Sequence, residues 1–247
     1  MRGAMSNDLL IENIWSKEEC RNFFQQTFSL ELTDSELESI WLDLSSNILT
    51  PLSKHGGNNL AFSPMKLKEI ITQTLARTAY DIKHPGFKKI REEVIPALVF
   101  ALFLKGLGHR DRLIVISDVP DIALVDADHI ASQQKRTRVG AIPIESIFYP
   151  ESAGDPSISD SAERVAEFVK SRKFNKRYRA ETVLLITLNA SLENLDLRKL
   201  SALLVPNTFH NIWLLAASGK RSIVALLTPE LKPSAMDFDR DLLPLLY

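Results

Sequence analysis

The chain has 247 residues, of which 45% are hydrophobic, enough to form the core of one large domain. Its formal net charge of -1 excludes a protein that binds nucleic acid or membranes through overall charge, so such binding requires a local cluster. One cysteine, Cys20, excludes an internal disulfide framework and a cysteine-rich zinc site. No apolar run reaches the ~18 residues of a membrane span, and no signal peptide is recognisable. We therefore expect a cytoplasmic protein that does not bind membranes.

Apolar side chains recur at helical spacing over residues 1–108, which we expect to form a helical N-terminal region. Ser16 and Thr33 each begin a capping-box pattern, and Ser63 precedes a proline at the first position of a third helix. A fourth expected helix carries the apolar run up to the glycines at 106 and 108. We expect residues 55–59, which are rich in glycine and asparagine, to form a loop.

After Gly108 the pattern changes to alternating and continuous apolar runs, which predict an α/β core over residues 109–247. The expected strands are 113–117, 121–125, 139–148, 183–188, 212–217 and 222–227. Residues 127–138 form a polar connection, a capping box at 160–163 begins a helix that continues toward Tyr178, and residues 195–204 form another helix. Because no linker rich in proline or serine separates the two regions, we expect one folded unit.

Two acidic residues lie on neighbouring expected strands. Asp121 follows Pro120 at the start of one strand, and Glu145 lies on the next. Adjacent strands can bring two carboxylates together, and Mg²⁺ prefers carboxylate and water oxygens. The pattern therefore predicts a metal site at Asp121 and Glu145. Two structural interpretations stay open: Asp121 ends a turn, and Glu145 is a surface residue on an edge strand.

The element order, together with Pro120-Asp121 and Glu145-Ser146-Ile147, resembles the PD-(D/E)XK phosphodiesterase superfamily over residues 88–190. The resemblance implies a restriction-endonuclease-like αβββαβ core, here with an N-terminal helical region and a C-terminal β-hairpin. It implies that Asp121 and Glu145 bind Mg²⁺ or Mn²⁺. It also implies a metal-dependent DNA endonuclease, of the kind found in restriction or defence systems.

The sequence departs from this family where the motif requires a lysine, because Ile147 stands two residues after Glu145. One alternative is that the next helix supplies the missing catalytic lysine, from Lys173 or Lys176, which share a helical face. The other is an inactive site on a protein that acts as a binding subunit or adaptor. Whether the chain is an enzyme thus stays open. We consider Glu92 and Glu93, before the first core strand, as additional carboxylates.

Positive charge is concentrated in two segments. Residues 164–179 carry seven basic residues against the single acid Glu167, and a second cluster occupies 135–138. We expect both segments to contact the phosphate backbone of DNA. The expected nucleic-acid-binding residues are Lys135, Arg136, Arg138, Lys170, Arg172, Arg177 and Arg179. We place the interleaved Phe174 and Tyr178 in the core. No pattern separates a homodimer or a protein partner from a monomer.

Overall fold

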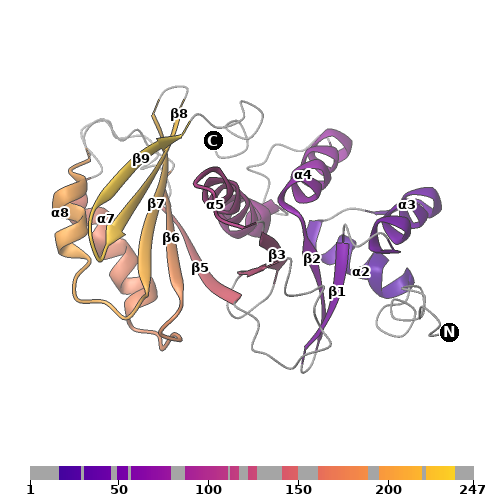
Figure 1. Cartoon of the computed structure of the whole chain (residues 1–247), viewed down its shortest axis with the longest axis horizontal. Helices are drawn as coiled ribbons and strands as arrows, with labels where there is room; N and C mark the ends of the chain where they lie inside the picture. Colours follow the sequence, from indigo (N-terminus) through magenta and orange to yellow (C-terminus); the bar gives the residue numbers. More distant parts are fainter. Residues whose placement is uncertain are drawn as a thin grey trace.

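The computed structural model forms one mixed sheet with helices on both faces (Figure 1). It describes residues 17–28, 31–45, 49–54, 57–78, 87–110, 112–116, 122–126, 141–149, 161–188, 195–218 and 221–236. The helices are α2 (Lys17–Phe28), α3 (Asp34–Ser45), α4 (Pro64–Thr78), α5 (Ile95–Gly106), α7 (Ala162–Val169) and α8 (Leu197–Leu203). Two π-helical turns, η2 (Ile90–Val94) and η3 (Lys170–Phe174), adjoin α5 and α7.

Among the described residues, nine strands follow one another in the sheet in chain order. They are β1 (Leu49–Lys54), β2 (Gly57–Phe62), β3 (Arg112–Ile116), β4 (Ile122–Asp126), β5 (Ala141–Tyr149), β6 (Val183–Leu188), β7 (Asn211–Ser218), β8 (Arg221–Thr228) and β9 (Lys232–Met236). The β5–β6 and β6–β7 pairs are parallel, and the other neighbouring pairs are antiparallel. The mixed α/β class expected from the sequence is therefore confirmed.

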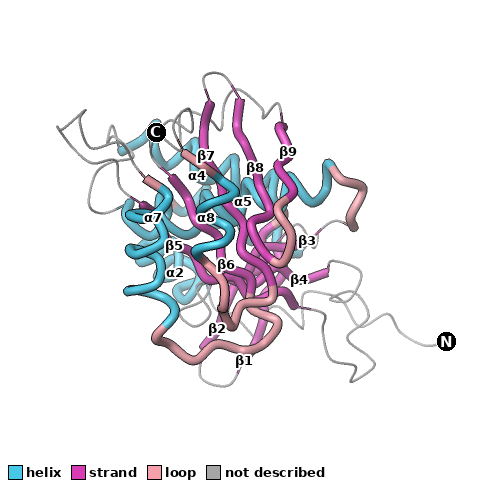
Figure 2. The backbone as a smooth tube through the Cα atoms, turned by 90° about the vertical axis from the view of Figure 1, so that its left-hand side faces the viewer, coloured by secondary structure: helices cyan, strands magenta, loops and turns pink. Residues whose placement is uncertain are grey.

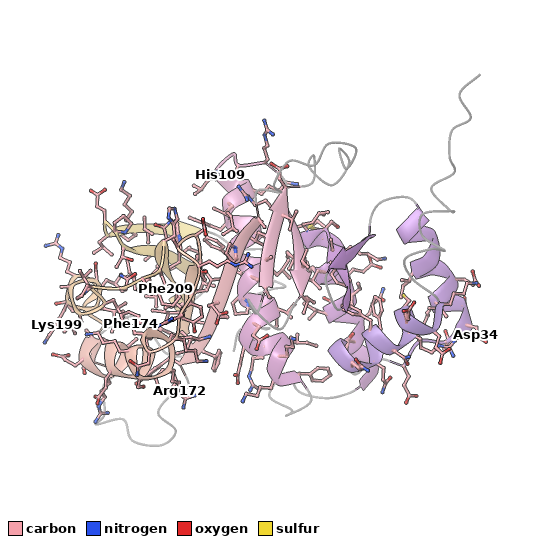
Figure 3. All side chains as sticks on the ribbon, turned by 90° about the horizontal axis from the view of Figure 1, so that it is seen from below. Asp34, His109, Arg172, Phe174, Lys199 and Phe209 are labelled. Atoms are coloured by element: carbon pink, nitrogen blue, oxygen red, sulfur yellow. The ribbon has the colours of Figure 1, made fainter. Side chains whose placement is uncertain are left out.

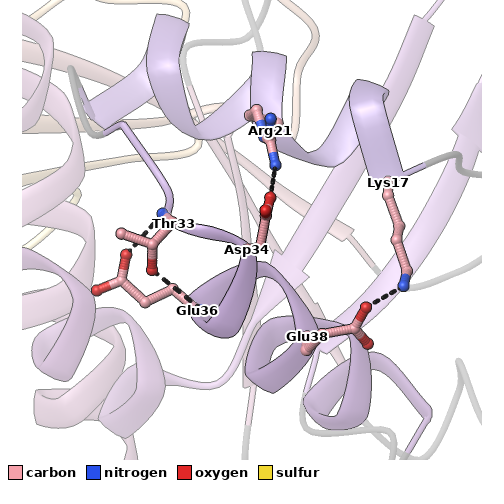
Figure 4. A network of polar contacts seen from close by, with 6 residues as sticks. All are labelled: Lys17, Arg21, Thr33, Asp34, Glu36 and Glu38. Atoms are coloured by element: carbon pink, nitrogen blue, oxygen red, sulfur yellow. Dashed lines mark hydrogen bonds and ion pairs between the residues drawn. The ribbon is translucent and has the colours of Figure 1, made fainter.

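Helices α2 and α3 form a hairpin held by polar contacts on its exposed side. Figure 4 shows the residues involved: Lys17, Arg21, Thr33, Asp34, Glu36 and Glu38. The expected capping box is present, because the Thr33 amide donates to Glu36 Oε2 at 2.9 Å and Thr33 Oγ1 accepts from the Glu36 amide. The Arg21–Asp34 ion pair, at 2.7 Å, is exposed, so it adds at most about 1 kcal/mol.

The N-terminal region is not purely helical, which corrects the expectation for residues 1–108. Strands β1 and β2 form an antiparallel hairpin, and β2 joins the sheet by pairing Phe62 with Ile114 of β3. The loop prediction for 55–59 is wrong at residues 57–59, which lie in β2. Glycine and asparagine have low strand propensity, so the register with β1, in which Gly57 faces Lys54, accounts for their extended conformation.

The strands of the C-terminal half agree with the sequence expectations to within about two residues, the usual disagreement between assignments. Strand β6 matches its predicted range, and β7 and β8 form the expected hairpin. Strand β9 was not expected, because Pro233 lies within it and lowers its strand signal. Proline is tolerated in β9 because this strand is last in the strand order of the sheet. On such an edge strand, the amides on the outer side have no neighbouring strand to pair with, so a missing N–H costs little.

Two apolar cores lie on opposite faces of the sheet. On one face, α5 packs with α4 and α2 around buried Phe24, Phe62 and Phe103. On the other face, α7 and α8 cover β5 to β8, as Figure 2 shows from their side. Strand β6 is buried on both faces, as its continuous apolar run predicted: Leu185 belongs to the first core and Leu184 to the second. The same alternation assigns each β5 side chain to a face.

The most apolar helix is α5, which has 12 residues. In the described part of the chain, no helix combines the length and the apolar character that crossing a membrane requires. Instead, α5 packs its apolar side chains into the first core, where Phe103 meets Trp213 of β7 with ring centroids 5.6 Å apart. The hydrophobicity of α5 is thus explained by a position against the sheet.

Cys20 of α2 is fully buried in the first core, and burial raises the pKa of its thiol to about 12. Because the thiolate is the reactive form, we expect the folded protein to resist a thiol reagent such as dithionitrobenzoate at pH ~8, below that pKa. The same cysteine should react fully in concentrated urea. The absorbance of released thionitrobenzoate measures both rates, and rapid labelling of the folded protein would contradict the burial of Cys20.

Candidate functional site: a buried carboxylate–lysine pair beside a cleft

Glu145 is a charged residue inside the sheet. Strand β5 is paired with β4 on one side and with β6 on the other, and Glu145 is 5% exposed. The interpretation of Glu145 as a surface residue on an edge strand is therefore wrong. Ile144 packs in the first core and Ile147 in the second, so alternation directs Glu145 toward α7 and η3.

Lys173 of η3 reaches this carboxylate. Its Nζ lies 2.9 Å from Glu145 Oε2, although the two residues are 28 positions apart in the sequence. Lys173 is 9% exposed, so both charges of the pair are buried. Buried charges require a partner, because an isolated charge loses its hydration without compensation. The pairing accounts for a lysine and a glutamate within an otherwise apolar layer.

The position of Lys173 follows from the local sequence of α7. Ser161 caps the helix, one residue after the start of the capping box expected at 160–163, with its Oγ accepting from the Arg164 amide. Val165 and Val169 then bury one face of α7 against the sheet. Lys173 comes four residues after Val169, so it continues this inward face into η3. The helical segment ends at Phe174, short of the Tyr178 expected from the sequence.

Both π-helical turns border the site. Lys173 lies in η3, and Glu92 and Glu93 lie in η2, immediately before α5. A π-helical turn widens the helix by one residue per hydrogen-bonded ring, and such turns occur frequently at functional sites. The two turns come from helices on opposite faces of the sheet. Because η2 and η3 both approach the same stretch of β5, this stretch is the best candidate for a functional site in the described residues.

A cleft of about 380 Å³ opens beside the pair. Its lining residues are Glu92, Glu93, Ser146, Ile147, Phe148, Arg172, Lys173 and Lys176. Among the described residues, β4 pairs with β5 over 141–144, so the part of β5 that lines the cleft lies beyond this pairing. Carboxylates from η2 and cations from η3 thus meet along one segment of strand.

The expected basic residues of the 164–179 segment lie on and around this cleft. Arg172 and Lys176 are exposed and line it, whereas Arg177 and Arg179 are exposed on the chain that follows, and Lys170 is half-buried. The guanidinium carbon of Arg172 lies 4.3 Å from the ring centroid of Phe168, within the range of a cation–π contact. The segment therefore presents positive charge to solvent next to the buried pair.

Several predicted site residues lie outside the described residues. They are Asp121, Lys135, Arg136 and Arg138. Within the described residues, no three side chains of His, Cys, Asp or Glu gather as a metal cluster. The described register pairs Ile122 with Ile144, and these are the sequence neighbours of Asp121 and Glu145.

Phe174 and Tyr178, predicted in the core, are half-buried and pack against the second core. They pack against Phe209, with ring centroids 6.0 and 4.8 Å from its ring. Figure 3 shows Phe174 and Phe209 together at the end of the molecule that carries Lys199. These rings anchor the basic segment to the sheet, which leaves its charged side chains at the surface.

A larger hollow of about 580 Å³ lies on the outer side of α7 and η3, lined by residues that include Glu163, Glu167 and Leu203. Its charged side chains are exposed or half-buried. Lys199 hydrogen-bonds Glu163 across the α7–α8 contact, and this cation lowers the pKa of the Glu163 carboxyl. Because chemistry generally needs groups shielded from water, the smaller cleft beside Glu145 is the better candidate.

Sequence reasoning did not identify Ser146 and Phe148 as lining residues. Strand alternation places both on the η2 side of β5, but it identifies them as lining residues only when the positions of the neighbouring helices are known.

Comparisons of the chain with protein-family models, with curated proteins and with solved structures found no match.

Proposed function

We propose that the protein is a metal-dependent DNA endonuclease, of the kind that serves restriction or defence. The observation that carries this proposal is the buried Glu145–Lys173 pair beside a polar cleft. The order η2–α5, β3, β4, β5, α7 and β6, with β5 parallel to β6, supports a restriction-endonuclease-like αβββαβ core. In this proposal Lys173 takes the role of the lysine that the motif requires at the position of Ile147.

The donor chemistry fits a Mg²⁺ or Mn²⁺ ion. Glu145, whose carboxylate accepts from the cleft-lining Lys173, would supply one carboxylate, and Asp121, which precedes the partner residue of Ile144, would supply the second. Glu92 and Glu93 bring further oxygens from η2. When bound, such an ion polarises a phosphate and lowers the pKa of water. Histidine and thiolate ligands, which softer metals prefer, do not line the cleft in the described residues.

The other residues of the site have electrostatic roles in this proposal. Lys173, held by Glu145 in a buried position, stabilises negative charge that grows on a phosphate oxygen during hydrolysis. Arg172 and Lys176 line the cleft, where they bind the flanking phosphates. Arg177 and Arg179 extend this positive surface, and we assign the same role to the cluster at 135–138.

Cleavage of plasmid and circular single-stranded DNA with Mg²⁺ or Mn²⁺ tests the proposal. We expect wild type to cut and both Asp121→Asn and Glu145→Gln to lose at least ~10²-fold in rate, because each removes a charge next to the reacting phosphate. Glu163→Gln is the matched control, since this carboxylate lies in the outer hollow and should not affect cutting.

Equal cutting by wild type and both site variants would indicate a contaminating nuclease and contradict the assignment of the site. If none of the proteins cuts either substrate, cleavage is not the function, and the fold serves a binding subunit or adaptor. Chelation by EDTA provides a further check, since it should abolish cutting by wild type.

A further inference from the structure

Phe148 is an aromatic residue at the cleft that the proposed reaction does not use. It lies on β5 three residues after Glu145, lines the cleft and is half-buried. Strand alternation directs it to the η2 side, where the guanidinium carbon of Arg91 lies 5.8 Å from its ring centroid. The ring is therefore held between the sheet and η2 and contributes an aromatic surface to a polar site.

The cleft has the size of a small-molecule site. Its volume of about 380 Å³ is at the lower end of the roughly 300–1,000 Å³ typical of such pockets. A single nucleotide fits this volume, whereas a base that remains paired in a duplex cannot enter a pocket of this kind. Access through the cleft to Lys173, which lines it, therefore favours a nucleotide that is not base-paired.

The cleft offers cations that suit the phosphate of a nucleotide and an aromatic ring that suits its base. Arg172 and Lys176 are exposed cations on its wall and match a phosphate. Phe148 offers a π surface, and stacking on aromatic side chains is how proteins hold unpaired bases of any sequence. Phe148 lies three residues after Glu145 on β5, and both cations lie within three residues of Lys173 in the chain.

We infer that the cleft binds one unpaired nucleotide of a single-stranded nucleic acid, with its base stacked on Phe148 and its phosphate directed to Arg172 and Lys176. As a statement about substrate, this rests on the proposed function, for which it predicts single-stranded or locally unpaired nucleic acid. DNA and RNA share the chemistry that the cleft recognises, so the test includes both.

The test measures the binding of fluorescein-labelled oligothymidylate and oligouridylate by anisotropy, in EDTA so that no strand is cut. We expect Phe148→Leu to weaken binding by about 5- to 100-fold, the loss of one base stack, while Phe148→Tyr binds as wild type does. Phe23→Leu is the matched control, because Phe23 is likewise a partly buried phenylalanine but packs on the first core and does not line the cleft. The tighter of the two oligonucleotides identifies DNA or RNA as the preferred strand.

The same measurement with a labelled duplex shows whether the effect is specific to single strands. The inference is overturned if Phe148→Leu binds single strands as wild type does, or if it loses duplex binding to the same extent. It is also overturned if wild type binds neither oligonucleotide. Thermal unfolding checks that Phe148→Leu is folded, and if it is not, weak binding by the folded Phe148→Tyr variant overturns the inference as well. The two measurements, cutting and binding, distinguish failure of the proposed function from failure of this inference. A wild type that binds through Phe148 but cuts nothing contradicts the endonuclease alone, whereas cutting without dependence on Phe148 contradicts this inference alone.

Discussion

Replacement of Lys173 by methionine is expected to lower metal-dependent DNA cleavage by about 10²- to 10³-fold, the usual cost of removing one group that stabilises transition-state charge. Methionine keeps an unbranched side chain, shorter by the terminal amino group, and removes the charge. Lys173 is the lysine in contact with Glu145, at 2.9 Å, and it is buried where a charge acts at low effective dielectric. Single-turnover rates at saturating DNA measure this loss without contributions from binding or product release.

Lys176→Met is the matched control, because Lys176 lines the same cleft but is exposed. We expect it to lower the cleavage rate at saturating DNA by less than ~10-fold, and to reduce the salt dependence of DNA binding by about one phosphate contact. A larger rate loss in Lys176→Met than in Lys173→Met would reverse the roles of the two lysines. A fully active Lys173→Met variant would leave the buried pair with a structural role.

The same substitution is expected to destabilise the fold. Lys173→Met leaves the Glu145 carboxylate buried without its partner, a change that costs about 3–5 kcal/mol of unfolding free energy in comparable buried pairs. The side chains of Lys173 and Glu145 are 11% and 7% exposed, so solvent screens this loss little. Adding Glu145→Gln to Lys173→Met removes the second charge, and we expect the double variant to recover most of the stability. Urea unfolding followed by circular dichroism measures all three free energies.

The double variant also separates structure from chemistry. We expect it to be nearly as stable as wild type and yet inactive, because it lacks both a metal ligand and the positive charge of the proposed site. The exposed Arg21–Asp34 pair is the reference, and Arg21→Met should change stability by less than about 1 kcal/mol. A cost below ~1 kcal/mol for Lys173→Met would mean that water reaches the Glu145–Lys173 pair, in conflict with its burial.

The sequence predicted the elements whose signals are local. The start of α7, the apolar run of β6 and the β7–β8 hairpin each depend on residues within a few positions, so the chain pattern was sufficient to find them. The opposite holds for β1, β2 and β9, whose residues have weak strand propensity. Their extended conformation depends on hydrogen bonding to neighbouring strands, which no short window of sequence contains.

The candidate site shows the same division. By itself, the sequence determined that Glu145 lies on a strand and that Lys173 follows in the next helical segment, since strand and helix periods fix these relations. Its placement of Lys176 on the same helix was wrong, because the helical segment ends at Phe174. The sequence left open which lysine serves and whether Glu145 is at the surface. Only the tertiary structure decided these points, because packing of α7 against β5 brings together residues 28 positions apart and buries Lys173, while Lys176 remains in solvent.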